Sequence, residues 1–282
     1  MHKPLMKPIR PLNVIELFPP LSQKLSQLLR SLGEDDWSKP TACALWTVKD
    51  IAAHLLGGSL GRLTHSEEEP SQSTKNELSF EQLVRLIDQE NDEWIKAARR
   101  INPTLLIEYL EIADAALYMH FKSLPMDAIA RTPVSWAGEL ESPNWMDIAR
   151  EYTEKWLHQQ QIWEAVGRPL LTAHKWLHPV LDTFVRALPY TYHDFVADDG
   201  TSLMVHVTGP AGGKWCLLRQ PGTWQLYSGT TSNPAARVEI DQDLAWRLFT
   251  KGISPGVAHS QVKIEGMRDL GERFLNTVSI MG

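Results

Sequence analysis

The chain has 282 residues, of which 43% are hydrophobic and 22% charged. This balance is typical of folded globular proteins and excludes collagen-like, coiled-coil and disordered chains, and the length is sufficient for two domains. With 28 basic and 34 acidic residues the net charge is −6, so the sequence gives no electrostatic reason to bind nucleic acid or anionic lipid.

The cysteine content and the hydropathy pattern indicate where the protein works. Only two cysteines are present, Cys43 and Cys216, which is too few for a disulfide framework and typical of a reducing compartment. No run of 18 apolar residues occurs, and prolines and charges interrupt the N-terminal segment. We therefore expect a cytoplasmic protein with no membrane segment. Because no base is adjacent in sequence, Cys43 is expected to be a small buried hydrophobic residue.

Apolar residues recur at helical spacing through the first 190 residues. Helices are expected over residues 21–32, 47–57, 79–101, 104–122, 145–166 and 179–188. The second helix begins at Thr47, whose Thr-x-x-Asp pattern with Asp50 is typical of a capping box, and is expected to stop at the pair Gly57-Gly58. A polar, acidic loop is expected over 63–79, before Ser79 caps the third helix.

The period of the apolar residues changes after Pro189. Strands are expected over residues 202–207, 214–219, 223–227, 237–241 and 261–265, and helices over 244–249 and 270–278. This order predicts a small α+β domain with a largely antiparallel sheet. We therefore place two domains at 1–190 and 191–282.

Glu154 and His158 carry the strongest chemical signal. Their i,i+4 spacing places both side chains on one helix face, about 5–6 Å apart at Cβ, so that both can bind one ion. His54 falls three residues after Ile51 and is expected to point inward as a third donor. Two histidines and one glutamate suit zinc or another divalent ion and leave one coordination position open. Spacing alone leaves the alternative of a surface pair and an ordinary core histidine.

Two motifs resemble a known family. Residues 46–55 read WTVKDIAAHL and are similar to the second-helix motif of the mycothiol-dependent maleylpyruvate isomerase N-terminal domain, one of the DinB-like metal-binding four-helix bundles. Residues 154–162 read EKWLHQQQI, with GRP at 167–169, and are similar to its second metal motif. The resemblance implies that His54, Glu154 and His158 bind the metal. The stretch VKIEG at 262–266, with a closing helix, resembles the sterol-carrier-like domain often attached to this bundle.

The resemblance implies a mixed, multidomain fold in which a helical bundle precedes the α+β domain. It also implies a metal-dependent enzyme that uses a low-molecular-weight thiol such as mycothiol, either to isomerise a cis-enoyl acid or to transfer the thiol to an electrophile. Many relatives carry Asp and Arg where this chain has Gln161 and Trp163, and Ile253 replaces a further Arg. These departures favour an alternative, a non-catalytic module that binds a metal and a small ligand.

Further site residues follow from helix phase and from the aromatic content. Gln161 lies seven residues after Glu154 on the same helix face, so we expect it to act beside the ion as a catalytic residue, with a solvent-facing position as the alternative. The residues expected to line the organic-ligand pocket are Trp46, Trp215, Trp224 and Tyr227. The three C-terminal aromatics fit the core of the sheet equally well.

Overall fold

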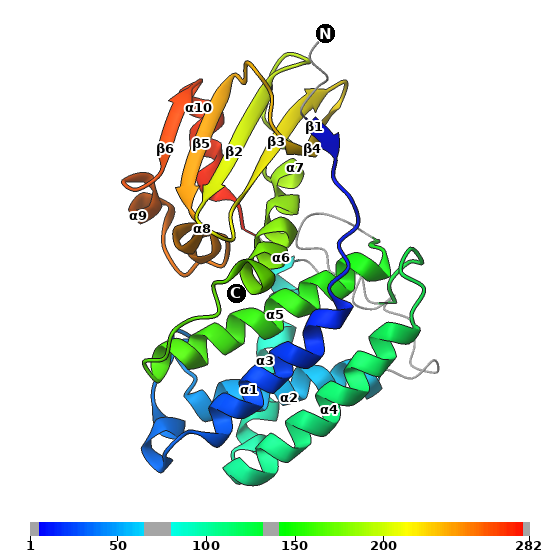
Figure 1. The fold of residues 1–282 in the computed structure, drawn as a ribbon, viewed down its shortest axis with the longest axis vertical. Helices are drawn as coiled ribbons and strands as arrows, with labels where there is room; N and C mark the ends of the chain where they lie inside the picture. Colours follow the sequence, from blue (N-terminus) through cyan, green and yellow to red (C-terminus); the bar gives the residue numbers. More distant parts are fainter. Residues whose placement is uncertain (1–5, 65–79, 132–140, 279–282) are drawn as a thin grey trace. The chain divides into compact units, whose positions relative to one another are not determined.

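The computed structural model describes residues 6–64, 80–131 and 141–278 (Figure 1). The chain forms two compact units, which are described separately. The helical unit consists of Asn13–Ala128 and Arg150–Leu170. The sheet unit consists of Ile129–Ala149, the chain from Leu171 onward, and the N-terminal segment up to Leu12. The expected mixed fold of helices followed by a sheet is confirmed.

This division differs from the expected boundary at residue 190. The first strand, β1 (Met6–Pro8), pairs with a strand of the C-terminal sheet, so the N-terminal segment belongs to the sheet unit. Helix α6 (His174–Phe184) also belongs there, and its Asp182 accepts a hydrogen bond of 2.9 Å from Nε1 of Trp215. Sequence periodicity identifies a helix such as α6 but not the element against which it packs.

Within the described residues, the helical unit is built from five helices. They are α1 (Phe18–Arg30), α2 (Val48–Thr64), α3 (Phe80–Ala98), α4 (Pro103–Ser123) and the part of α5 (Asn144–Ala165) that begins at Arg150. The backbone of α2 packs most closely against α4 and α3, and α1 packs against α4. Their apolar faces form one shared core, which includes Leu25, Leu29, Ile51, Leu56, Leu106 and Leu110.

Helix α2 begins with the expected capping box. The backbone N–H of Thr47 donates to Oδ2 of Asp50 at 3.0 Å, and the backbone N–H of Asp50 donates to Oγ1 of Thr47 at 3.3 Å. Arg99 also donates to both oxygens of this carboxylate, at 2.9 and 3.0 Å. The carboxylate thus fixes the start of α2 and ties it to the end of α3.

The expected stop at Gly57-Gly58 is wrong, because α2 continues to Thr64. Gly57 makes room for an indole: a Cβ at this position would lie 2.5 Å from Nε1 of Trp94. That Nε1 donates to the carbonyl of Ala53 at 2.7 Å, so the ring of Trp94 lies directly on α2. Of the expected loop over 63–79, residues 63 and 64 belong to α2, and the rest, including Ser79, lies outside the described residues.

The sheet unit contains a six-stranded sheet in the order β1-β4-β3-β2-β5-β6. After β1, the strands are β2 (Ser202–Thr208), β3 (Gly213–Gln220), β4 (Thr223–Gly229), β5 (Ala236–Asp241) and β6 (Lys263–Gly266). Neighbouring strands are antiparallel except for β2 and β5, which are parallel. The expectation of a largely antiparallel sheet is therefore confirmed, with one parallel pair and with β1 as an additional strand.

The sheet unit also contains helices. Besides α6 they are α7 (Leu188–Thr191), α8 (Gln242–Phe249), α9 (Pro255–His259) and α10 (Arg268–Glu272). Leu203, Val205 and Val207 of β2 are fully buried, and Phe249 of α8 packs edge-on against Phe184. In the part of the chain that the structure describes, each helix is too short or too polar to cross a membrane.

Candidate metal centre

The structure brings His54 of α2 together with Glu154 and His158 of α5. One ligand atom from each residue lies within 4.8 Å of the other two. Nε2 of His158 is 3.4 Å from Oε2 of Glu154, and the rings of His54 and His158 lie 4.6 Å apart at their centroids. Tetrahedral ligands at about 2.0–2.1 Å from zinc lie about 3.4 Å from each other. The Glu154–His158 pair has this spacing already, so the donor set fits a divalent ion.

The local folding of two helices explains this convergence. Glu154 and His158 are one turn apart on α5, and the longer side chains of such a pair meet on one helix face. His54 is flanked on α2 by Ala53 and Leu55, which are buried in the helical core, and is itself half-buried. The expectation that His54 points inward toward the α5 pair is confirmed by the ring contact.

The two histidines differ in protonation. Burial and the neighbouring charge of His158 lower the pKa of His54 to about 3, against a hydrogen bond with Asn91, so His54 is neutral and has a lone pair for a cation. Burial also lowers the pKa of His158, but hydrogen bonds with Cys43 and Glu154 outweigh it and raise this pKa to about 10. His158 therefore carries the proton of the site, and a cation held by its Nε2 must displace that proton.

Gln161 lies beside His158. Its Oε1 is 2.8 Å from Nδ1 of His158 and 3.3 Å from Sγ of Cys43. With Nδ1–H donating to this amide oxygen, Nε2 is the nitrogen that faces Glu154, and partners of this kind orient metal ligands. Gln161 is thus near the candidate ligands rather than directed only to solvent, and its catalytic role stays a prediction.

Cys43 makes a contact with Gln161 that the sequence did not predict. The expectation of a small buried hydrophobic residue is met only in part: Cys43 packs against the helical core but is half-buried, and its thiol donates to Gln161. It belongs to the short turn before α2, where Trp46 donates its backbone N–H to the carbonyl of Cys43 at 2.8 Å. Since 118 residues separate Cys43 from Gln161, no local pattern signals this contact.

The predicted pocket aromatics fall into two groups. The ring of Trp46 lies 4.8 Å from that of His54 and 6.2 Å from that of His158, so Trp46 forms one wall of the candidate centre. Trp215 and Trp224 are only 2% and 3% exposed within the sheet unit. This burial fits the alternative in which they fill the core of that unit.

Tyr227, the remaining predicted aromatic, is half-buried on β4. Its hydroxyl accepts a hydrogen bond of 2.6 Å from Nε2 of Gln220 and donates one of 2.9 Å to Oε1 of Gln225. These partners tie the phenol hydroxyl to β3 and β4. Ligand binding by Tyr227, Trp215 and Trp224 stays a prediction.

Comparison with known proteins agrees with the geometry. Residues 18–163, slightly more than half of the chain, match the family model described as the mycothiol maleylpyruvate isomerase N-terminal domain. The chain belongs to this family. The matched residues include all three candidate ligands and Gln161, so the resemblance drawn from the two motifs is confirmed.

Two solved structures are also similar to most of the chain. They are crystal structures of the mycothiol-dependent maleylpyruvate isomerase, at 15% identity, and of a mutant of that enzyme, at 14%. Each match covers 89% of this chain and 91% of that chain, with a TM-score of 0.49. No curated protein matches this chain.

Proposed function

We propose that the protein binds one divalent cation through His54, Glu154 and His158 and uses a low-molecular-weight thiol in the reaction of its family. The observation that carries the proposal is the convergence of these three donors within the matched family domain. Two imidazoles and one carboxylate are a common zinc set, and three protein ligands leave a position for an exogenous group.

The residues around the donors have separate tasks. A bound divalent cation supplies the positive charge that lowers the pKa of a thiol beside it. His54 is neutral and offers its lone pair without losing a proton, while Gln161 holds His158 by Nδ1 so that Nε2 faces Glu154. Trp46 covers the two histidines with an apolar ring and limits the access of water. The site contains a single carboxylate, and the neutral amide of Gln161 adds no charge that would repel a thiolate.

The reaction we favour is the cis–trans isomerisation of an enoyl acid. The thiolate adds to the double bond, the resulting single bond rotates, and elimination returns the thiolate and the isomerised bond. The cycle consumes no thiol and requires no residue to store a proton once the thiolate has formed. It is therefore compatible with an amide at Gln161, which cannot accept a proton as a carboxylate does.

Two other functions use the same centre. Transfer of the thiol to an electrophile would consume one thiol per turnover. The non-catalytic module, favoured by Gln161 and Ile253 in place of charged residues, would hold the metal and a small ligand without turnover. Metal binding is common to all three functions, so they are distinguished by what happens to the thiol.

The first test is metal content. We expect the purified protein to contain one equivalent of zinc by mass spectrometry and His54→Ala to contain none. His178→Ala is the matched control, because this histidine lies in the sheet unit, where its Nδ1 bonds the carbonyl of Ala211 at 3.0 Å. Full zinc content in His54→Ala would contradict the three-ligand site.

The second test uses the thiol. Mycothiol is titrated into the cobalt-substituted protein, and the visible absorption of cobalt is followed, before turnover of maleylpyruvate is measured with and without the thiol. A spectral change with thiol-dependent isomerisation supports the isomerase. A spectral change with loss of free thiol supports the transferase, and an unchanged spectrum without turnover supports the non-catalytic module.

A further inference from the structure

A buried ion pair lies next to the candidate metal ligands. Lys155, the residue after Glu154, places Nζ 2.8 Å from Oδ1 of Asp114 on α4, and the two side chains are only 5% and 6% exposed. Removing two charges from water is costly, and apolar residues of similar volume often fill such a space with equal or greater stability. The position of the pair, more than its energy, therefore calls for an explanation.

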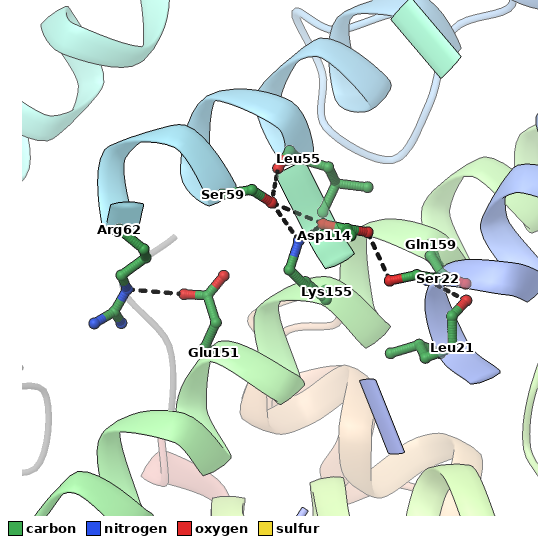
Figure 2. A network of polar contacts seen from close by, with 9 residues as sticks. All are labelled: Leu21, Ser22, Leu55, Ser59, Arg62, Asp114, Glu151, Lys155 and Gln159. Carbon is green, nitrogen blue, oxygen red and sulfur yellow. Dashed lines mark hydrogen bonds and ion pairs between the residues drawn. The ribbon is translucent and has the colours of Figure 1, made fainter. Parts of the chain in front are cut away.

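Two serines extend the pair into a network that joins four helices (Figure 2). Oγ of Ser59, on α2, lies 2.8 Å from Nζ of Lys155 and 2.8 Å from Oδ1 of Asp114. Ser22, on α1, donates to Oδ2 of the same carboxylate at 2.6 Å. A single buried cluster thus contacts α1, α2, α4 and α5.

The network reaches both helices that carry the candidate ligands. On α5, Lys155 directly follows Glu154. On α2, Oγ of Ser59 lies 3.0 Å from the carbonyl of Leu55, the residue after His54. An outer bridge also joins these helices, since Nε of Arg62 lies 3.2 Å from Oε2 of Glu151 (Figure 2). The backbone of α2 packs most closely against α4 and α3, so these side-chain bridges provide direct contacts between α2 and α5.

A small shift between these helices would act directly on the centre. His54 comes from α2 and the other two donors from α5, so sliding one helix along the other changes the distance between His54 and the pair. Metal ligation tolerates errors of only about 0.2 Å. The Lys155–Asp114 ion pair joins α5 to α4, and Ser59 ties α2 to both members of the pair. A directional polar network of this kind favours one offset between α2 and α5, whereas apolar contacts allow neighbouring offsets at similar energy.

We propose that Lys155, Asp114 and Ser59 are positioning residues of the metal centre, which hold α2 against α5 at the offset where His54 meets Glu154 and His158. The inference rests on the proposed metal binding. It assigns to the network a role in ligand geometry that is separate from its contribution to folding.

The matched comparison is Ser59→Ala against Ser22→Ala. Each variant removes one hydroxyl that contacts the carboxylate of Asp114, but only Ser59 lies on a helix that carries a ligand. We expect the dissociation constant for Zn²⁺, measured by competition with a chelating indicator, to rise about tenfold in Ser59→Ala, as for other residues that orient ligands. The absorption of the Co²⁺ form should change as well. In Ser22→Ala both should stay within about twofold of the wild type.

A second variant separates geometry from stability. Lys155→Met with Asp114→Leu removes both charges at similar volume, and Ser59 retains the carbonyl of Leu55 as an acceptor. We expect a urea midpoint no lower than that of the wild type, together with at least about tenfold weaker Zn²⁺ binding. If this variant does not fold, the comparison of Ser59→Ala with Ser22→Ala alone tests the inference.

The outcomes distinguish this inference from the proposed function. Folded Ser59→Ala with wild-type Zn²⁺ affinity and Co²⁺ spectrum overturns the inference alone, as does equal weakening in Ser59→Ala and Ser22→Ala. A wild-type chain that binds no Zn²⁺ overturns the proposed function and this inference with it.

Discussion

A largely buried ion pair is present in each unit, with the same nitrogen–oxygen distance of 2.8 Å but different surroundings. Lys155 and Asp114 come from two helices of the helical unit and are enclosed by its core. Asp182 lies on α6, and Arg186 lies four residues later in the 3-10 turn Val185–Ala187 that follows this helix; the side chains of Arg186 and Asp182 are 10% and 14% exposed. Distance alone therefore does not define what an ion pair does; the elements it joins decide that.

The remaining partners of each pair sharpen the difference. Besides Asp182, Arg186 donates to the carbonyl of Arg10 at 2.7 Å and lies 4.9 Å over the ring of Trp145. Among the described residues, Lys155 has Asp114 as its acidic partner and otherwise the hydroxyl of Ser59. If the aspartate is removed, Arg186 in the sheet unit keeps its other contacts. Lys155 in the helical unit is left with a buried ammonium group and the hydroxyl of Ser59.

The largest expected effect is on folding of the helical unit. Asp114→Leu leaves the charge of Lys155 buried without a counter-charge, and we expect the free energy of unfolding in urea to fall by about 3–5 kcal/mol. In the sheet unit, Asp182→Asn keeps an oxygen acceptor for Nε1 of Trp215, and Arg186 keeps the carbonyl of Arg10 and the ring of Trp145, so we expect a clearly smaller loss. Equal losses of unfolding free energy in the two variants would show that the two ion pairs contribute equally to stability.

The sequence predicted those features that depend on patterns within a short stretch of residues. The apolar repeats of α1 to α5 identified these helices, and the i,i+4 spacing of Glu154 and His158 identified two of the three candidate ligands, because both patterns lie within a few residues. The position of His54 three residues after Ile51 suggested the third donor, and the family motif around it implied the same residue. The capping box at Thr47 and Asp50 was likewise readable, since capping is a local interaction.

Contacts between distant segments could not be predicted from the sequence. Lys155 and Asp114 are 41 residues apart, and a single charged residue within an apolar repeat does not indicate which residue it pairs with. Gly57 resembled a helix stop because its role, making room for Trp94, depends on a different helix. The strand β1 has three residues, too few to show a period of two. In each case the missing information is tertiary.

The second prediction concerns Asp50, a buried carboxylate whose cationic partner is exposed. Its side chain is 3% exposed, but its partner Arg99 is 54% exposed. Burial raises the pKa of Asp50, yet hydrogen bonds from Arg99 and Thr47 outweigh burial and hold it below its ordinary value. At neutral pH we expect Asp50→Asn to lose about 1–2 kcal/mol of unfolding free energy, from the cap and the charged hydrogen bonds.

The sign of the pH dependence follows from that lowered pKa. The folded state favours the carboxylate, so its contribution is complete above the unfolded pKa of about 3.9 and is lost as the pH falls through the folded value. Urea unfolding between neutral and strongly acidic pH should therefore show the wild type and Asp50→Asn converging below about pH 4. A difference that stays constant across this range would mean that the ionisation of Asp50 adds nothing to stability.

The smallest expected effect is at Gln161, where a charge is added beside the candidate centre rather than removed from the core. Gln161→Asp places a carboxylate near His158 and opposes the charge that attracts a thiolate. We expect the apparent pKa of the bound thiol to rise by about one unit and anionic ligands to bind more weakly at neutral pH, with metal content unchanged. Gln161→Asn shortens the side chain equally without adding charge, so the difference between the two variants isolates the electrostatic effect. Thiol binding measured against pH decides the point, since coincident curves for these two variants would place residue 161 outside the electric field of the centre.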